Sequence, residues 1–129
     1  PVEAVPLAID ELPALLIAAA CAEGVTVLRG AEELRVKESD RIASMAEGLS
    51  QLGIENTVQP DGIKVVGGDL SGGVITTHHD HRIAMSFSMA ALRASDRTKV
   101  SDCAHVATSF PGFADLALQT GLRLEVAEE

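Results

Sequence analysis

The stretch IDELPALLIAAACAEG, at residues 9–24, is the most informative part of the chain. From Leu12 to Ala22 it is apolar on nearly every side, which is typical of a helix that is buried all round. Asp10 stands at its start as a candidate N-cap, and Pro13 suits a first helical turn. The apolar run is much shorter than the roughly 20 residues needed to cross a bilayer. It therefore predicts a buried helix and no membrane span.

The same pattern recurs further along the chain. A second helix that is apolar nearly all round is predicted at Ile83 to Leu92, and it follows Asp80, which stands 70 positions after Asp10. Two amphipathic helices are predicted to begin at the N-cap candidates Ser39 and Ser109, which are also 70 positions apart. These spacings indicate two repeats, each with a buried helix and an amphipathic helix on an outer layer.

Short strand-forming runs separate these helices. Pro60-Asp61-Gly62 is expected to join two of the strands as a tight hairpin, and Gly53 and Gly121 to end the amphipathic helices. This alternation predicts an α/β fold, of the mixed kind (α+β) that includes antiparallel hairpins. The predicted strands are Val25–Arg29, Ile54–Val58, Ile63–Val66, Val74–Thr77, Thr98–Ser101 and Leu122–Val126.

Composition narrows the classes of function. The 129 residues, 47% of them apolar, are enough for one globular domain. Lys and Arg number 10 against 19 Asp and Glu, and the net charge of −9 argues against a nucleic-acid backbone or an anionic membrane as the main partner. Aromatic residues make up 2%, so the stacking platforms of single-strand binders are missing. An anionic ligand would need a local cationic pocket.

The cysteines and the first residues indicate the cellular location of the protein and whether the chain is part of a longer gene product. Cys21 and Cys103 form no C-x-x-C pair, which favours a reducing, cytoplasmic location, and Cys21 is interpreted as a small core side chain. Residues 1–10 lack the basic start of a secretory signal, and position 1 is not Met. We therefore expect the chain to be part of a longer gene product.

Cations stand at two predicted helix starts, where the helix dipole disfavours them by roughly 0.3–1 kcal/mol. Lys37 and Arg41 lie at one start, and His81 and Arg82 lie at the other. Such a placement is explained if the cations and the backbone N–H groups together hold an external anion. Lys37 and Arg41 would reach the same side if helical geometry extended back to Lys37. The alternative is a set of solvated surface charges that pair with neighbouring carboxylates.

Two carboxylates lie beside these cations in the sequence. Asp10 begins an otherwise apolar helix, and Glu38 stands between Lys37 and Arg41. If two anions are gathered here, a carboxylate near each would have the position for general acid and general base catalysis. The structural alternative makes Asp10 a plain N-cap and Glu38 a first-turn acid.

The histidines allow a different interpretation. All four lie in the second repeat, and a metal cluster of His79, His81, His105 and Cys103 is conceivable. A helix that starts at Asp80 would splay these side chains, and the sequence holds no companion ligand motif. We therefore expect no metal site, and a non-catalytic anion- or metal-binding module remains the alternative from another class.

Four motifs occur in order along nearly the whole chain: IDELPALLIAAACAEG at 9–24, LRVKESDRI at 34–42, DHRIAMSF at 80–87 and ATSFPGF at 107–113. Together they resemble the C-terminal part of the 5-enolpyruvylshikimate-3-phosphate (EPSP) synthase family. The resemblance implies a partial C-terminal domain over residues 1–129. It would hold two β-α-β-α-β-β repeats, at about 4–68 and about 73–127, of an enolpyruvyl transferase domain (an inside-out α/β barrel) with parallel buried helices.

The resemblance implies transfer of the enolpyruvyl group of phosphoenolpyruvate to the 5-hydroxyl of 3-phosphoshikimate, with release of phosphate. The reaction would pass through a tetrahedral intermediate and need no metal or organic cofactor. By motif match, Asp10 would take the hydroxyl proton and hold shikimate. Glu38 would protonate the methylene carbon, and His81 would lie near Glu38 in the proton relay.

The same match assigns the cations to substrates. Lys37 would contact 3-phosphoshikimate, and Arg41 and Arg82 would bind phosphoenolpyruvate. Two positions depart from the family pattern, because Thr108 stands where many members have Lys, and Glu33 where many have Asn. Thr108 is therefore a doubtful ligand of phosphoenolpyruvate. The ATSFP form suggests the branch that includes glyphosate-tolerant enzymes.

A sibling family, the enolpyruvyl transferases that act on UDP-N-acetylglucosamine, shares this fold and chemistry. This makes it the nearer of two alternatives, but it lacks the K-E-S-D-R and D-H-R pattern in this form, so the EPSP synthase family is favoured. Since the resemblance covers only the C-terminal part of the family's enzymes, the N-terminal domain is an expected partner. We expect this chain alone to be inactive.

Overall fold

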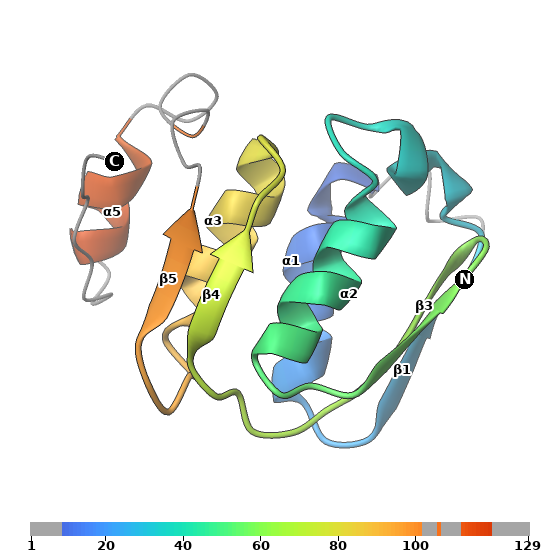
Figure 1. Cartoon of the computed structure of the whole chain (residues 1–129), viewed down its shortest axis with the longest axis horizontal. Coiled ribbons are helices and arrows are strands. Elements are labelled where there is room, and N and C mark those ends of the chain that lie inside the picture. The colour runs from blue at the N-terminus through green and yellow to red at the C-terminus, as the bar shows by residue number, and fades with distance from the viewer. Residues whose placement is uncertain (1–8, 102–105, 107–111, 120–129) are drawn as a thin grey trace.

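The computed structural model of the protein describes residues 9–101, 106 and 112–119. Figure 1 shows α1 and α2 between two small sheets, with α3 beside them and behind β4 and β5. None of the described helices is long and apolar enough to span a membrane. The helices are α1 (Leu12–Cys21), α2 (Arg41–Gln51), α3 (His81–Ala90) and α5 (Phe113–Gln119), with 3-10 helices η2 (Ile9–Glu11) and η3 (Glu32–Val36).

The first sheet is antiparallel, in the strand order β1-β3-β2. Its hairpin pairs Gln59 with Gly62, which confirms the predicted tight connection. A Cβ atom on Gly62 would lie 1.8 Å from the backbone oxygen of Leu28, so only glycine lets β3 approach β1 this closely. The strands are β1 (Val25–Leu28), β2 (Asn56–Gln59) and β3 (Gly62–Val66).

The second sheet is a parallel pair, β4 (Gly73–Thr76) and β5 (Thr98–Ser101), with α3 in the crossover between them. Parallel neighbours need such a crossover, because a tight hairpin joins only antiparallel strands. Figure 1 shows that β4 ends at the same end of the molecule at which α3 begins. This places the D-H-R segment, residues 80–82, next to the start of α2.

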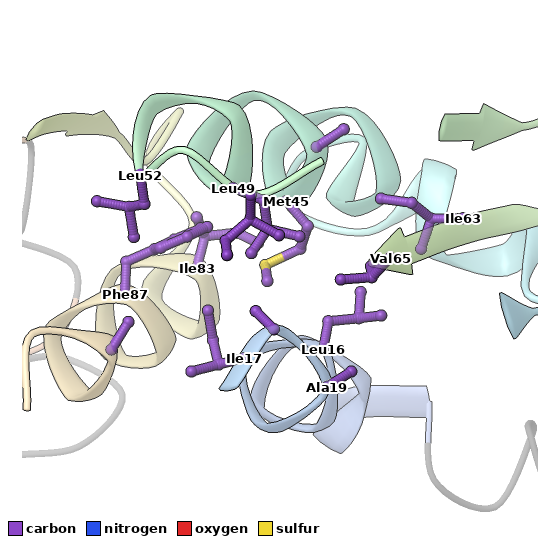
Figure 2. Packing of buried hydrophobic residues seen from close by; sticks show 14 of the residues in the cluster. Leu16, Ile17, Ala19, Met45, Leu49, Leu52, Ile63, Val65, Ile83 and Phe87 are labelled. Carbon is purple, nitrogen blue, oxygen red and sulfur yellow. The ribbon is translucent and has the colours of Figure 1, made fainter. Parts of the chain in front are cut away.

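The core joins three helices and β3. Figure 2 shows side chains from each helix meeting in one cluster, which β3 closes from one side. Burial of each large apolar side chain contributes roughly 1.5–3 kcal/mol, so this cluster holds the helices in one arrangement. Its central members are Leu16 and Ile17 of α1, Met45 and Leu49 of α2, Ile83 and Phe87 of α3, and Ile63 and Val65 of β3.

The prediction that two helices are buried on every side is wrong for the described residues. Leu15 on α1 is 53% exposed and Met89 on α3 is 36% exposed, although both helices are apolar nearly all round. The remaining faces of α1 and α3 pack against each other, α2 and the sheets. On α2, by contrast, Glu47 and Gln51 are exposed, as expected of a one-sided helix. Ser44, which we expected on the same outer face, is buried, and its Oγ donates to Ser39 Oγ.

Other expectations are confirmed with small shifts. The strands begin or end within one or two residues of the predicted positions, but Ile54, predicted to open a strand, is buried just before β2. Gly53 ends α2 with a positive φ of 82°, as a C′ residue does. Gly121, Ser109, Cys103, His105, Thr108 and the strand predicted at 122–126 lie outside the described residues.

Candidate active site

The first turns of α1, α2 and α3 meet at one end of the core, at the top of the view in Figure 1. Arg41 at the start of α2 contacts Asp10 from the segment before α1 and Asp80 from the segment before α3. Arg82 Nη1 donates to the backbone oxygen of Asp10 at 3.2 Å. The start of each α-helix carries a partial positive charge, so this meeting point suits anions. It also brings Asp10, Glu38, Arg41 and Arg82, which the sequence singled out, into one place.

Arg41 is the centre of the cluster and is only 1% exposed. Its Nε donates to Asp80 Oδ2 at 2.8 Å and its Nη2 to Asp80 Oδ1 at 3.3 Å. At the other end, Nη1 donates to Asp10 Oδ1 at 3.2 Å and Nη2 pairs with Glu38 Oε2. The interpretation of Arg41 as a solvated surface charge is therefore wrong, because a buried guanidinium needs partners for its five N–H groups.

The three carboxylates around Arg41 differ in exposure. The side chain of Asp80 is fully buried, whereas those of Asp10 and Glu38 are 45% and 53% exposed. With all three ionised, the cluster holds one positive and three negative charges, and Arg82 is the adjacent cation. Asp10 and Glu38 therefore reach both Arg41 and solvent, from which an acid or base exchanges protons.

Asp80 does two tasks at once. It is the N-cap of α3, the helix predicted to follow it, and its Oδ1 accepts from the backbone N–H groups of Arg82 and Ile83. Its Oδ2 accepts from Ser39 Oγ at 2.8 Å and from Arg41. Burial by itself raises the pKa of Asp80, but the hydrogen bonds from Arg41 and Ser39 and the charge of Arg41 outweigh it, so the pKa lies below its ordinary value of 3.8.

Two N-cap predictions are wrong. The N-cap of α2 is Asp40, whose side chain accepts from Ala43 N at 3.1 Å, and not Ser39. The N-cap of α1 is Glu11, which makes no capping side-chain bond, and Asp10 lies one residue earlier in η2. Ser39 and Asp10 are instead recruited by the cluster, because their side chains point to Asp80 and Arg41.

Lys37 stands at the end of η3 and is not part of α2. It follows η3 with an extended backbone, so helical geometry does not continue back to it from α2, and the condition for a shared face is not met. Its Nζ lies 3.9 Å from Glu33 Oε1, which is an ion pair longer than a hydrogen bond. Glu38 also stands before α2 rather than in its first turn.

A pocket of about 220 Å³ opens beside the cluster, between α1 and α3. Its polar end is formed by Asp10, Glu11 and Arg82, and its apolar part by Ala14, Ile17, Met85 and Met89, with Ser86 between them. The residues from the two helix starts line one end and those from the later turns line the other, so α1 and α3 run parallel, as expected. Among the described residues, the guanidinium of Arg82 makes one hydrogen bond, to Asp10 O, and its other N–H groups remain for a ligand.

The described histidines, His78, His79 and His81, lie around the start of α3. His81 is the first residue of α3, and no hydrogen bond joins it to Glu38 within the described part of the chain. His78 Nε2 lies 3.1 Å from Glu47 Oε2, and His78 and His79 have positive φ values of 51° and 61°. Over residues 9–101, 106 and 112–119, no group of three or more His, Cys, Asp or Glu could hold a metal ion.

The sequence did not indicate that Asp80 would bind Arg41, or that Ser39 would bind Asp80. Both were singled out only as helix caps. A signal was present, because an arginine at the start of an amphipathic helix with buried neighbours requires a carboxylate from elsewhere, and Asp80 stands at the predicted start of another helix.

Comparisons with known proteins identify one family. The profile of the EPSP synthase (3-phosphoshikimate 1-carboxyvinyltransferase) family matches residues 2–116. A 3-phosphoshikimate 1-carboxyvinyltransferase of Methylococcus capsulatus is 61% identical over 127 residues, which are 98% of this chain and 29% of that protein. One of Alkalilimnicola ehrlichii is 62% identical over 121 residues, 93% of this chain and 27% of that protein.

A solved structure of EPSP synthase from Acinetobacter baumannii is similar with a TM-score of 0.96 and 58% sequence identity. The match covers 99% of this chain and 31% of that one. The chain thus spans less than a third of the length of the relatives that it matches.

Proposed function

Because the chain belongs to the EPSP synthase family, we propose that it forms part of the active site of a 3-phosphoshikimate 1-carboxyvinyltransferase. The longer protein would transfer the enolpyruvyl group of phosphoenolpyruvate to the 5-hydroxyl of 3-phosphoshikimate and release phosphate. The observation that carries the proposal is the meeting of two arginines, Arg41 and Arg82, with the half-exposed carboxylates Asp10 and Glu38 at three helix starts.

The two arginines would bind phosphoenolpyruvate, which carries a carboxylate and a phosphate. Arg82 lines the pocket, and among the described residues its guanidinium donates only to Asp10 O. Arg41 presents Nη1 and Nη2 toward the half-exposed side of the cluster. An anion that binds this end of Arg41 would displace Asp10 and Glu38 from it. Substrate binding would thereby release the two carboxylates that the chemistry needs.

The released carboxylates have complementary tasks. Asp10 would take the proton of the attacking hydroxyl as its oxygen bonds to C2 of phosphoenolpyruvate, and Glu38 would give a proton to the methylene carbon C3. The resulting tetrahedral intermediate loses phosphate as its C–O bond breaks and C3 gives back a proton. Both side chains are about half exposed, which allows them to exchange protons between turnovers.

The remaining site residues are part of the proposal. Lys37 would contact 3-phosphoshikimate, with Glu33 as its neighbour, and His81 would assist proton transfer near Glu38. Thr108 lies outside the described residues, so its place near phosphoenolpyruvate rests on the motif match. We place the protein in the cytoplasm, where Cys21, a free thiol, would stay reduced.

The test is a chimera in which this chain replaces the matching segment of the Methylococcus capsulatus relative. Phosphate release from phosphoenolpyruvate is measured with 3-phosphoshikimate or UDP-N-acetylglucosamine as the acceptor. We expect activity with 3-phosphoshikimate alone, and a loss of about 100-fold or more in Asp10→Ala and Arg82→Ala. The matched controls, Asp69→Ala and Arg93→Ala, change exposed residues away from the cluster and should stay within about twofold.

Four results would count against the proposal. A folded chimera that releases no phosphate with either acceptor removes it, and so does a preference for UDP-N-acetylglucosamine. Full activity in Asp10→Ala and Arg82→Ala would contradict the roles assigned to Asp10 and Arg82. Appreciable turnover by the 129-residue chain alone would contradict the expectation that it holds only part of the site.

A further inference from the structure

We propose that Asp80 is a positioning residue for Arg41, which it holds by one edge so that the opposite end stays directed at the anion site. The inference rests on the proposed function for the identity of the anion. The hydrogen bonds between Arg41 and Asp80 would persist when substrate binds. The hydrogen bonds from Arg41 to Asp10 and Glu38 would be replaced by hydrogen bonds to the substrate. Nothing in the family match assigns Asp80 a role.

The contact between Asp80 and Arg41 defines an orientation. Two carboxylate oxygens meet two nitrogens of one guanidinium edge, Nε at 2.8 Å and Nη2 at 3.3 Å. A two-point contact to a planar group fixes both its plane and its rotation, which a single charge would not do. Because Asp80 is fully buried and Arg41 is 1% exposed, water does not offer either group an alternative partner.

Asp80 is itself anchored to the fold. Its Oδ1 accepts from Arg82 N at 3.0 Å and from Ile83 N at 3.4 Å, and its Oδ2 accepts from Ser39 Oγ at 2.8 Å. The carboxylate is therefore tied to the first turn of α3, the same turn that carries the side chain of Arg82. Through Asp80, the two proposed phosphoenolpyruvate-binding cations have a defined spacing, although they lie on different helices.

Exposure separates the permanent partner from the exchangeable ones. Asp10 and Glu38 are 45% and 53% exposed, so water and ligand can reach them and replace them on Arg41. Displacement of Asp80 would leave a buried carboxylate without its cation, which is strongly unfavourable. An incoming anion therefore meets Arg41 at Nη1 and Nη2, and the Asp80 edge stays in place.

The informative variant is Asp80→Asn. Asparagine caps helices about as well as aspartate, and its remaining oxygen can still accept from the N–H groups of α3. Its Nδ2 group replaces Oδ2, so a donor then faces Arg41 Nε. The matched control is Asp40→Asn, at the N-cap of α2, because the Asp40 side chain also accepts from an arginine, Arg35, yet makes no hydrogen bond to the guanidinium of Arg41.

The first measurement is made on the chain alone, by NMR of the arginine Nε–H groups. The Arg41 signal is assigned by its disappearance in Arg41→Lys. We expect it to be shifted and slow to exchange in the unsubstituted chain and in Asp40→Asn, and to exchange at least about tenfold faster in Asp80→Asn, since the hydrogen bond is lost. An unchanged Arg41 signal in folded Asp80→Asn would overturn the proposal.

The second measurement is the KM for phosphoenolpyruvate in the chimera. We expect it to rise by about tenfold or more in Asp80→Asn, because misplacement of a binding group by about an ångström has effects of this size. A merely structural role would reduce kcat through a smaller folded fraction and leave KM unchanged, and that result would also overturn the proposal.

The two failures are distinguishable. If the unsubstituted chimera is inactive, the proposed function fails, and the NMR measurement still decides whether Asp80 orients Arg41. Should Asp80→Asn not fold, Ser39→Ala takes its place, because Ser39 Oγ donates to the same oxygen of Asp80. It should accelerate exchange of the Arg41 Nε–H by a smaller factor, and no acceleration would count against the proposal.

Discussion

At the scale of single residues, the cluster depends on one buried arginine. Arg41→Ala leaves the carboxylate of Asp80 buried without its cation, so we expect the free energy of unfolding to fall by about 3–5 kcal/mol. Urea unfolding followed by circular dichroism measures this loss. Arg29→Ala breaks the exposed pair with Asp61 and should lower the free energy of unfolding far less, because solvent screens such pairs. Equal losses in the two variants would mean that burial does not strengthen the Arg41 pair.

The ionisation of Asp80 should also appear in the pH dependence of stability. Because its pKa is lower in the folded chain than in the unfolded chain, the ionised carboxylate stabilises the fold at pH above 3.8. That contribution is lost as the pH falls through the lower folded-state pKa. Asp80→Asn should therefore show a shallower decline of the urea midpoint below about pH 4 than the unsubstituted chain.

Asp69→Asn, which changes an exposed carboxylate, is the control for the pH series. It should follow the curve of the unsubstituted chain. The pKa of Asp61 is lowered by hydrogen bonds from Gly30 N and Arg29. Asp61 therefore contributes to the loss of stability at low pH in all three proteins and does not affect the difference between their curves. Parallel curves for Asp80→Asn and the unsubstituted chain would contradict the prediction.

At the scale of elements, the packing of α2 against α3 depends on Gly48. A Cβ atom at this position would lie 2.3 Å from Cζ of Phe87, whose side chain is fully buried. Gly48→Ala should therefore destabilise the fold by about 1–3 kcal/mol, although alanine favours helices more than glycine does. Thermal unfolding of the variant measures the effect.

A second substitution separates the clash from other causes. In Gly48→Ala/Phe87→Leu the smaller side chain leaves room for the new methyl group, so the double variant should lose less stability than the two single losses added together. Gln51→Ala, on the exposed face of α2, should change stability by less than about 0.5 kcal/mol. Simple additivity in the double variant would show that Gly48 is required for another reason.

At the scale of the whole molecule, the apolar surface of α1 and α3 is incompletely covered. Leu15 is 53% and Met89 36% exposed, and a mainly apolar pocket lies between the two helices. Since the chain spans less than a third of its relatives' length, we expect this face to be covered in a longer protein and to drive self-association of the isolated chain.

Sedimentation velocity at increasing concentration tests the association. Leu15→Glu/Met89→Glu should remain monomeric at concentrations at which the unsubstituted chain associates. The control is Val36→Glu, which removes an apolar side chain that is 78% exposed but lies at the end of η3. If Val36→Glu abolishes the association and Leu15→Glu/Met89→Glu does not, the associating surface lies elsewhere.

Part of the fold and of the site could be predicted because its causes are local. Periodicity over about 10 residues locates a helix, and the Pro60-Asp61-Gly62 turn determines its own hairpin. The unusual position of Arg41 and Arg82 at helix starts is visible in the sequence alone and indicates anion binding. The start of α3 at Asp80 was also correct, although the same local rule failed for Asp10 and Ser39.

By itself, then, the sequence determined the order of the elements, the family, and the residues from which a site could be built. Only the tertiary structure decided that Arg41 is buried and that Asp80, 39 residues away, holds it. It also decided that Ser39 and Asp10 serve this cluster instead of capping helices. The physical reason is that the burial of a charge and its partners depend on how α1, α2 and α3 pack, and this packing sums many weak contacts between residues distant in the chain.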